Sequence, residues 1–320
     1  MINEFAPAKI NLSLPLVGQK SDGYHLLDSI VSFVNVGDTL RMTPGGSSGL
    51  VVEGPFAKDL PSSNHNLVFK AAEIFSNVRL PQITLEKNIP VASGIGGGSA
   101  DAAATVRLIS KVYDEPKPPI NKLISLGADV PVCMHKGIVR MMGVGEKIIN
   151  LSPAPNVGIL LVNPRKALST SEVFNAVKKK NNSGVKSHTF MEDKLNLWFD
   201  WINSMRNDLT SSAINLVPEI RFILDKLVTC DGAKVVRMSG SGATCFALFE
   251  NFDLLQDAKD KIGKDLNLLK DGYEACWVTE FPMFEKDNDG KVSALHHPFT
   301  SPAQSDLEEL QKIDINSIKE

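Results

Sequence analysis

A glycine-rich segment in the first third of the chain constrains the fold more than any other feature. The segment Pro90–Ala100 reads PVASGIGGGSA, and apolar residues then recur every fourth position, at Ala100, Ala104, Leu108 and Val112. This spacing predicts a helix that begins at the end of the loop. Glycines let the backbone approach a phosphate closely, and a helix N-terminus offers that anion free N–H groups and a positive dipole end. The segment therefore predicts a phosphate-binding loop.

Other interpretations of this loop are less specific. A glycine loop can simply pack a helix against a sheet without any ligand. The chain contains no GxxxxGK[ST] sequence, and Gly94, Gly96 and Gly98 alternate without the GxGxxG spacing of dinucleotide-binding folds. We expect Ser99 to cap the helix and to be able to reach a phosphate or a metal-bound water.

Strand and helix patterns follow one another irregularly along the chain. Apolar or alternating runs predict strands over residues 10–17, 29–36, 82–87, 159–162, 243–249 and 273–278. Helical spacing predicts helices that begin near residues 66, 99, 120, 193, 218 and 254. Because strands and helices do not alternate regularly, we expect an α+β fold rather than a doubly wound parallel sheet.

The composition excludes several classes of protein. The 320 residues carry a formal net charge of −3 at pH 7, so no overall positive charge attracts nucleic acid or anionic lipid. No apolar run approaches the roughly 20 residues that span a bilayer, and the first residues lack a secretory signal pattern. The cysteines are far apart and form no C-x-x-C pair. We expect a cytoplasmic protein whose partners are neither nucleic acid nor membrane.

Three segments together resemble the superfamily of galactokinase, homoserine kinase and mevalonate kinase. The glycine loop is similar to the superfamily's ATP loop. Ala6–Leu12 (APAKINL) is similar to its first motif, and Met238–Phe246 (MSGSGATCF) to its third. The resemblance implies a two-lobed α+β kinase that uses ATP and Mg²⁺, with an N-terminal lobe over residues 1–158 and a C-terminal lobe over residues 159–279.

Further segments resemble one branch of this superfamily, the diphosphocytidyl-methylerythritol kinases. They are Asp22–His25 (DGYH), Gly127–Val132 (GADVPV), Leu160–Pro164 (LLVNP) and Ser169–Phe174 (STSEVF). The resemblance implies ATP-dependent phosphorylation of the 2-hydroxyl of 4-diphosphocytidyl-2-C-methyl-D-erythritol, in the non-mevalonate route to isoprenoid precursors. A non-catalytic nucleotide- or sugar-binding protein on the same fold is the alternative.

The resemblance also implies roles for individual residues. Asp129 is expected to take the proton of the hydroxyl, with Lys9 beside it as the cationic partner; outside the motifs, each is more simply a surface charge or a turn residue. The implied ATP-binding residues are Asn66, Pro90, Val91, Ala92, Ser93, Gly94, Ile95, Gly96, Gly97, Gly98, Ser99 and Ala100. The implied substrate-binding residues are Asn11, Tyr24, His25, Phe174, Gly240, Ser241 and Gly242.

Two aromatic residues in the substrate set are expected to form a base pocket. By resemblance, Tyr24 and Phe174 hold a cytosine between their rings, and His25 supplies hydrogen bonds because stacking alone selects poorly among bases. Core packing is the simpler alternative for both rings. Mg²⁺ is expected because it bridges ATP phosphates, with Ser99 as a candidate ligand. We expect a monomer or weak homodimer that acts on a small molecule.

The segment 280–320 differs in character from the rest of the chain. It is charged, broken by prolines and without a long periodic segment. Trp277–Phe284 (WVTEFPMF) and Ala294–Pro302 (ALHHPFTSP) resemble part of bacterial aspartyl-tRNA synthetase. So short a fragment cannot build a catalytic sheet alone, so we expect a poorly ordered remnant of a fusion or frameshift. An RNA-binding function would need a basic patch with interleaved aromatic residues, which this sequence lacks.

Overall fold

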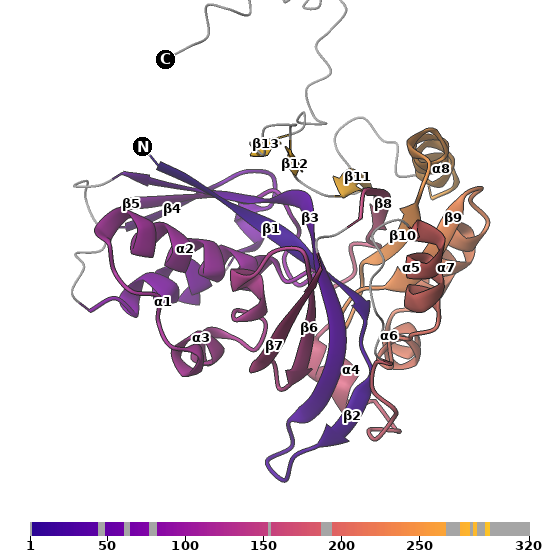
Figure 1. Ribbon diagram of the computed structural model, residues 1–320, viewed down its shortest axis with the longest axis horizontal. Helices are drawn as coiled ribbons and strands as arrows, with labels where there is room; N and C mark the ends of the chain where they lie inside the picture. Colours follow the sequence, from indigo (N-terminus) through magenta and orange to yellow (C-terminus); the bar gives the residue numbers. More distant parts are fainter. Residues whose placement is uncertain are drawn as a thin grey trace, which may run out of the picture. The chain divides into compact units, whose positions relative to one another are not determined.

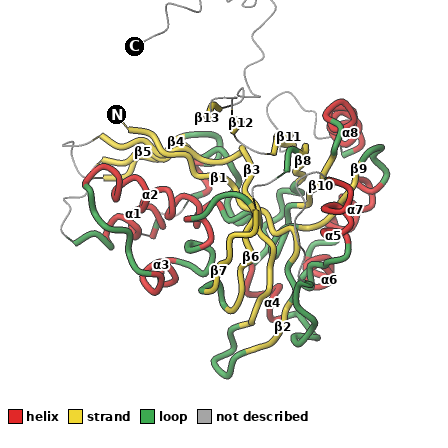
Figure 2. Tube along the Cα trace, in the orientation of Figure 1, coloured by secondary structure: helices red, strands yellow, loops and turns green. Residues whose placement is uncertain are grey.

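The computed structural model of the chain describes residues 2–43, 49–60, 65–76, 82–152, 155–186, 194–266, 276–281, 284–286 and 292–294. They belong to two compact units, Met1–Pro282 and Met283–Glu320. The first unit contains two β-sheets with helices packed on them (Figures 1 and 2).

The first sheet has seven strands and is built around one long strand. Its strands are β1 (Ile2–Ser13), β2 (Leu16–Gln19), β3 (His25–Thr43), β4 (Gly49–Glu53), β5 (Gln82–Glu86), β6 (Ile138–Gly143) and β7 (Lys147–Ser152). The order is β4-β5-β3-β6-β7, and β1 and β2 also pair with β3. All neighbours are antiparallel except β4 and β5. Strand β3 therefore joins the sheet's two halves.

Three helices cover one face of this sheet (Figure 1). They are α1 (Leu67–Glu73), α2 (Gly97–Tyr113) and α3 (Ile120–Leu126), with short 3₁₀ turns at Ala57–Asp59 and Val132–Met134. The first two turns of α2 bury Ala100 and the run Ala102–Ala104 in the core beneath β1 and β3. Because these side chains are short, α2 lies close against the sheet. None of the described helices is long and apolar enough to cross a bilayer.

The second sheet is antiparallel, and its two central strands are buried on both faces. Its strands are β8 (Val157–Val162), β9 (Ala233–Met238), β10 (Cys245–Phe249) and β11 (Cys276–Phe281), in the order β11-β8-β10-β9. Its helices are α4 (Thr170–Asn175), α5 (Leu195–Asn203), α6 (Thr210–Leu216), α7 (Glu219–Val228) and α8 (Phe252–Asp265). Every residue of β8 is buried, which requires cover on each side.

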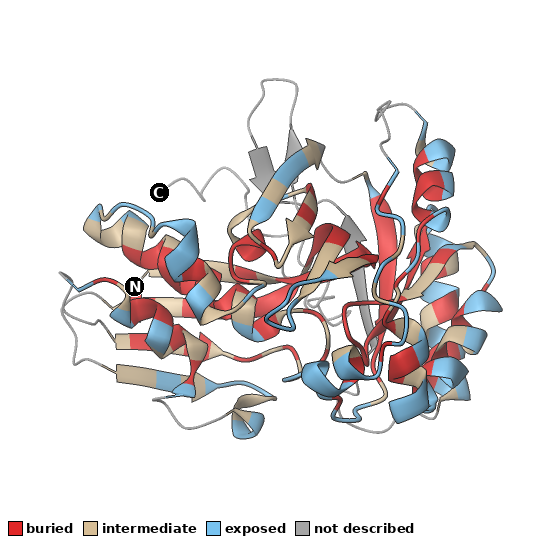
Figure 3. Cartoon of the chain, turned by 90° about the horizontal axis from the view of Figure 1, so that it is seen from below, coloured by how far each residue is buried: buried red, intermediate tan, exposed pale blue. Residues whose placement is uncertain are grey.

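Alternation along β8 and β10 divides their side chains between two cores. Leu161 and Phe246 pack with Ile10 of β1, so the two sheets pack against each other. Leu160 and Phe249 pack on the opposite side with residues of α6, α7 and α8. Figure 3 shows the resulting burial along the strands and the inner helix faces. The layers run from helices through two sheets to helices, which confirms the predicted α+β class.

The structure extends several predicted elements. The predicted strands at 10–17 and 29–36 are parts of the longer β1, β2 and β3, because pairing carries each strand beyond its most apolar run. Helices α4 and α6 were not predicted, and the polar stretch after α4 is a loop as expected over its described residues, up to 186. The division into lobes at residue 158 stays a prediction, since Met1–Pro282 forms one unit.

The predicted start of the tail at residue 280 lies inside a strand. In β11, Glu280 pairs with Gly158 and Phe281 pairs with Val157. The second sheet therefore continues to residue 281. In the second unit, β12 (Phe284–Lys286) and β13 (Val292–Ala294) pair antiparallel. This regular structure was not expected in a segment broken by prolines. The rest of the tail lies outside the described residues, and its resemblance to a synthetase stays a prediction.

A chain that ends at residue 282 is expected to keep its melting temperature and to keep its kcat within about twofold, because residues 283–320 form a compact unit of their own. Thermal unfolding and steady-state kinetics test this. The matched control ends at residue 275, which removes β11 and makes the buried strand β8 an edge strand. We expect this shorter chain to unfold at a clearly lower temperature. Equal destabilisation of both chains would show that residues 283–320 are an integral part of the fold.

Candidate active site

An ion pair lies where the first sheet meets the glycine loop. The Nζ of Lys9, on β1, is 2.9 Å from the Oδ2 of Asp129, which follows α3. Lys9 is almost fully buried, with a side-chain exposure of 5%, whereas Asp129 is 34% exposed. The backbone N–H of Lys9 donates to the carbonyl of Ile95 at 2.9 Å, which joins β1 to the loop. The pair thus presents a fixed carboxylate to solvent with a buried cation behind it.

A chain of hydrogen bonds holds Lys9 from the other side. Its Nζ donates to the Oδ1 of Asn11 at 2.7 Å, and the Nδ2 of Asn11 donates to the Oγ of Ser29 at 2.8 Å. Ser29 in turn donates to the carbonyl of Ser13 at 2.6 Å. These contacts fix the orientation of the Asn11 amide, whose oxygen is the second partner of the Lys9 ammonium after Asp129. The sequence did not indicate that these two serines belong to the site, because a serine on a strand has no distinctive pattern around it.

Helix α2 begins two residues earlier than expected. Helix α2 begins at Gly97, and its N-cap is Gly96, with φ of +68°, a left-handed conformation that favours glycine. The expectation that Ser99 caps the helix is therefore wrong, since Ser99 is the third helical residue. The first intrahelical bond runs from the Ala100 N–H to the Gly96 carbonyl. The N–H groups of Gly97, Gly98 and Ser99 precede that bond and are open to an anion.

Other residues of the loop pack in the hydrophobic core or form turns. Ile95 and Ala100 are buried in the hydrophobic core, so their side chains do not face a nucleotide. Ser93 donates from its Oγ to the carbonyl of Pro90 at 2.8 Å, which closes the first turn of the loop. Ala92 has a φ of +53°, and Val91 is 39% exposed. The first three residues of α2 are Gly97, Gly98 and Ser99, and the role of the loop in binding ATP stays a prediction.

The third motif packs directly against this loop. The Oγ of Ser239 donates to the carbonyl of Gly94 at 3.1 Å and accepts the backbone N–H of Asn11 at 3.1 Å. Thr244 donates to the carbonyl of Ser93 from both its N–H, at 3.2 Å, and its hydroxyl, at 2.5 Å. A Cβ at Gly94 would collide with the carbonyl of Gly242. Three sequence-distant motifs therefore meet around one loop.

Glycine is also required within the third motif. A Cβ at Gly240 would lie 2.7 Å from the carbonyl oxygen of Gly94 and 3.3 Å from the Oδ1 of Asn11. The Nδ2 of Asn207, which sequence reasoning missed, donates to the carbonyls of Met238 and Gly240 at 2.8 Å each. The Oγ of Ser241 is 2.9 Å from the Oγ1 of Thr170, at the start of α4. This contact joins the third motif to the helix that carries Phe174.

The structure pairs Phe174 with His25 rather than with Tyr24. The centroids of the Phe174 and His25 rings are 5.1 Å apart, tilted by 41°, whereas Tyr24 is 65% exposed. The Nε2 of His25 is buried without a hydrogen-bond partner. Burial lowers the pKa of His25, and the positive charge of Lys180 lowers it further. A neutral imidazole with one unused nitrogen thus stands beside an aromatic ring.

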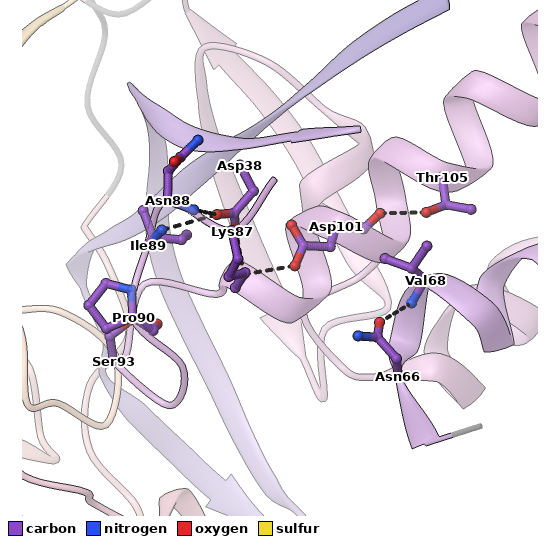
Figure 4. Close-up of polar contacts among 10 residues, drawn as sticks. All are labelled: Asp38, Asn66, Val68, Lys87, Asn88, Ile89, Pro90, Ser93, Asp101 and Thr105. Atoms are coloured by element: carbon purple, nitrogen blue, oxygen red, sulfur yellow. Dashed lines mark hydrogen bonds and ion pairs between the residues drawn. The ribbon is translucent and has the colours of Figure 1, made fainter. Parts of the chain in front are cut away.

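Asn66 is a helix cap. It is the N-cap of α1, and its Oδ1 accepts the N–H of Val68 at 2.9 Å (Figure 4). The prediction that Asn66 opens this helix is confirmed, and its oxygen is committed to the cap. The neighbouring Leu67 lies 3.4 Å from where a Cβ on Gly98 would stand, so the N-termini of α1 and α2 are adjacent. A role for Asn66 in nucleotide binding stays a prediction.

The comparisons with known proteins agree with this geometry. Residues 66–139 match the GHMP kinases N terminal domain, and residues 191–268 match the GHMP kinases C terminal domain. The 4-diphosphocytidyl-2-C-methyl-D-erythritol kinase of Roseobacter denitrificans is 41% identical over 282 residues, which cover 87% of this chain and 92% of that protein. The enzyme of the same name from Ruegeria pomeroyi is 44% identical over 78% of this chain and 88% of its own.

Solved structures show the same relationship. A crystal structure of 4-(cytidine 5'-diphospho)-2C-methyl-D-erythritol kinase superposes with a TM-score of 0.69 at 27% identity, covering 87% of this chain and 98% of that one. The homoserine kinase of Cytophaga hutchinsonii shares the fold, with a TM-score of 0.61 at 18% identity, covering 88% of this chain and 94% of its own. Fold and matches together define a small-molecule kinase of the GHMP class. Within that class, the chain belongs to the 4-diphosphocytidyl-2-C-methyl-D-erythritol kinase family.

Proposed function

We propose that this protein transfers the γ-phosphoryl group of ATP to the 2-hydroxyl of 4-diphosphocytidyl-2-C-methyl-D-erythritol. The observation that carries the proposal is the Lys9–Asp129 pair, held at 2.9 Å beside the open N-terminus of α2. Family membership supports the substrate, because the relatives' names state it. A protein that only binds nucleotides or sugars has no need of a partly exposed carboxylate fixed against a buried lysine.

The chemistry assigned to the pair is a proton transfer coupled to phosphoryl transfer. Asp129 takes the proton of the substrate hydroxyl, the oxygen bonds to the γ-phosphorus, and the bond from that phosphorus to ADP breaks. Lys9 fixes the carboxylate and places a positive charge near the transferring group. In phosphoryl transfer, positioning and charge stabilisation contribute more than a strong base. The N–H groups of Gly97, Gly98 and Ser99 hold the phosphates at the helix end.

The protein groups near this site fit a magnesium ion held mainly by the nucleotide. Across the described ranges, no three His, Cys, Asp or Glu side chains gather as a metal site. Mg²⁺ in kinases is bound by few protein groups plus phosphates and water, and it neutralises phosphate charge when bound. Ser99 in the first turn of α2 and the partly exposed carboxylate of Asp129 are the groups that would face it. The donor set is therefore compatible with Mg²⁺.

We place the cytidine end of the substrate at the His25–Phe174 pair. A base that enters here stacks on Phe174 and uses the free Nε2 of His25 as a hydrogen-bond partner. Tyr24, which is exposed, can then close on the opposite face of the base. Asn11 and the third motif, near Lys9, support the acceptor end. This arrangement makes the cytidine handle orient the reacting hydroxyl.

The replacement Phe174→Ala is expected to raise the KM for the cytidine substrate about 5- to 150-fold, because stacking on one base contributes about 1–3 kcal/mol. The KM for ATP should change little. Steady-state kinetics with each substrate varied in turn measures both values. The control is Phe222→Ala on α7, whose ring is 52% exposed and belongs to no proposed site. If Phe174→Ala raised both KM values equally, the base pocket would lie elsewhere.

One assay tests the function as a whole. ADP release is followed with 4-diphosphocytidyl-2-C-methyl-D-erythritol, and separately with methylerythritol phosphate, mevalonate, homoserine and galactose. We expect turnover with the first compound and poor efficiency with the others, which lack the cytidine handle. Binding of ATP without ADP release from any acceptor would favour the non-catalytic alternative. Comparable efficiency with another acceptor would move the protein to a different branch of its class.

We further propose that the enzyme acts in the cytoplasm as a monomer or weak homodimer. Among the described residues, Cys133, Cys230 and Cys245 are free and buried, which suits a reducing compartment. The slightly negative net charge gives no reason to expect nucleic acid as a partner.

A further inference from the structure

A buried ionic cluster lies directly behind the glycine loop (Figure 4). The Nζ of Lys87 is 2.5 Å from the Oδ2 of Asp38 and 2.8 Å from the Oδ2 of Asp101. The exposures of the three side chains are 1%, 0% and 3%. Asp38 belongs to β3, Lys87 follows β5, and Asp101 is in the second turn of α2. The ammonium of Lys87 thus connects the first sheet to α2, the helix whose N-terminus is the proposed phosphate site.

The cluster also fixes the chain as it enters the loop. The second oxygen of Asp38 accepts the backbone N–H groups of Asn88 at 2.6 Å and Ile89 at 3.0 Å. The backbone of Lys87 itself is held on both sides, by the carbonyl of Glu53 at 2.7 Å and the N–H of Phe56 at 3.2 Å. The start of the loop and its helical end are therefore bound to the same three side chains.

Lys87 touches the first residue of the helix. A Cβ added to Gly97 would lie 3.1 Å from the Nζ of Lys87 and 2.9 Å from the Cδ1 of Ile89. One residue earlier, a Cβ at Gly96 would lie 2.6 Å from the Cγ of Lys9. The two glycines at the junction thus leave room for two lysines, one on each side. Glycine at these two positions therefore has a structural cause, the space that the lysines occupy, in addition to access for a phosphate.

The free energy of unfolding alone does not explain why the fold keeps this cluster. Burying three charged groups costs free energy, and well-packed apolar residues in their place are often as stable or more so. A cation at a helix N-terminus also opposes the dipole. The Oδ1 of Asp101 is buried without a hydrogen-bond partner. Burial raises the pKa of Asp101 well above its usual value, Lys87 lowers it, and Asp38 raises it again.

We propose that Lys87, held between Asp38 and Asp101, is a positioning residue that sets the register of the α2 N-terminus against the loop and so places the phosphates of ATP. It acts through these carboxylates and does not itself touch the nucleotide. The inference rests on the proposed function only in taking the open end of α2 as the ATP site. It is independent of which acceptor the enzyme phosphorylates.

The test is the isosteric change Asp101→Asn in the full chain. We expect Kd for ATP·Mg²⁺, measured by calorimetry, and KM for ATP to rise about 10-fold or more, because small displacements of phosphate-binding groups are costly. The KM for the cytidine substrate should stay within about twofold. By charge alone, loss of a carboxylate near an anion site would strengthen ATP binding or leave it unchanged. Weaker binding of ATP would therefore indicate that the phosphate-binding groups have been displaced.

The matched control is Glu4→Gln. Glu4 pairs with Arg107 at 2.5 Å, two turns further along the same helix and away from the loop. We expect this change to lower stability without changing Kd for ATP. Equal effects of Asp101→Asn and Glu4→Gln on Kd, or an effect of Asp101→Asn on melting temperature alone, would overturn the proposal.

A second variant decides the matter if Asp101→Asn does not fold. The triple replacement Asp38→Asn, Lys87→Met and Asp101→Asn keeps the volume of the cluster and leaves no buried charge unpaired. The proposal requires this protein to fold and to bind ATP at least about 10-fold more weakly. Wild-type ATP affinity in the folded triple variant would sink the proposal. Direct binding of ATP separates these outcomes from a wrong acceptor, which would change only the turnover assay.

Discussion

The replacement Asp129→Asn is expected to lower kcat by about 10²–10⁴-fold, which is the usual contribution of a general base. The amide keeps the size of the carboxylate and one oxygen for Lys9, so the geometry of the site survives. It cannot accept the proton of the hydroxyl. The change removes the anionic partner of the buried Lys9 ammonium, which keeps the amide oxygens of Asn11 and of the introduced side chain as acceptors, so we expect a lower melting temperature but a folded protein. The KM for ATP should change much less than kcat. Coupled ADP-release kinetics and a thermal melt measure these effects.

The molecule offers a matched control for this change. Asp265 of α8 pairs with Lys226 at 2.9 Å and is 33% exposed, so the carboxylate matches Asp129 in distance and exposure, whereas Lys226 is 35% exposed and Lys9 is 5% exposed. Asp265→Asn should therefore cost less stability than Asp129→Asn, because its partner lysine is solvated, and should have no effect on turnover. If Asp129→Asn kept more than about a third of wild-type kcat, its loss would be far below that of a general base, and the assignment would be wrong.

Local patterns predicted the parts of this site that depend on neighbours in sequence. The helical repeat after Gly98 predicted α2, and the helical spacing from Asn66 predicted the start of α1, because both depend on spacing within one turn or two. The position of the helix start was missed. Glycine at position 96 can adopt a φ of +68°, so the helix begins two residues before Ser99 without a side-chain cap.

The contacts that assemble the site could not be read from local sequence. Asn11 meets Ser239, 228 residues further along the chain, and Lys87 meets Asp38 across 49 residues. Such pairs form only when both sheets and α2 are in place. The resemblance to a family brought the motifs together, but it assigned no partner to Lys87. A lysine at the end of an amphipathic strand looks like an ordinary solvated charge.

The aromatic pocket shows the same limit. Sequence placed Tyr24, His25 and Phe174 in one set, yet the structure selects His25 as the ring beside Phe174. The two residues belong to different elements, the start of β3 and the last turn of α4. Neither periodicity nor composition determines which of two adjacent residues on a turn points to a helix in another part of the chain. Tertiary packing decides this.

The replacement Gly96→Ala is expected to lower kcat/KM by about 10²-fold or more, because a misplacement near 1 Å of a catalytic group has an effect of that order. The new methyl group would lie 2.6 Å from the Cγ of Lys9. Lys9 is buried and held by Asn11 and Asp129, so its side chain can move only by breaking the contacts that place its ammonium. The left-handed backbone at Gly96 adds strain of about 1–3 kcal/mol.

Loss of activity after Gly96→Ala must be separated from general backbone strain, and Gly232 allows this. Gly232 has a φ of +78°, and an added Cβ there would lie 2.6 Å from the Cδ1 of Leu254, a side-chain atom as at Gly96. It lies in the turn before β9, away from the loop and the ion pair. Gly232→Ala should therefore lower the melting temperature by a similar amount and leave kcat/KM of the folded protein within about twofold. Similar kinetic losses in both variants would mean that strain spreads through the fold. Wild-type kinetics for Gly96→Ala would mean that the loop tolerates a shift of Lys9, and the tight junction between loop, lysine and helix would then not control catalysis.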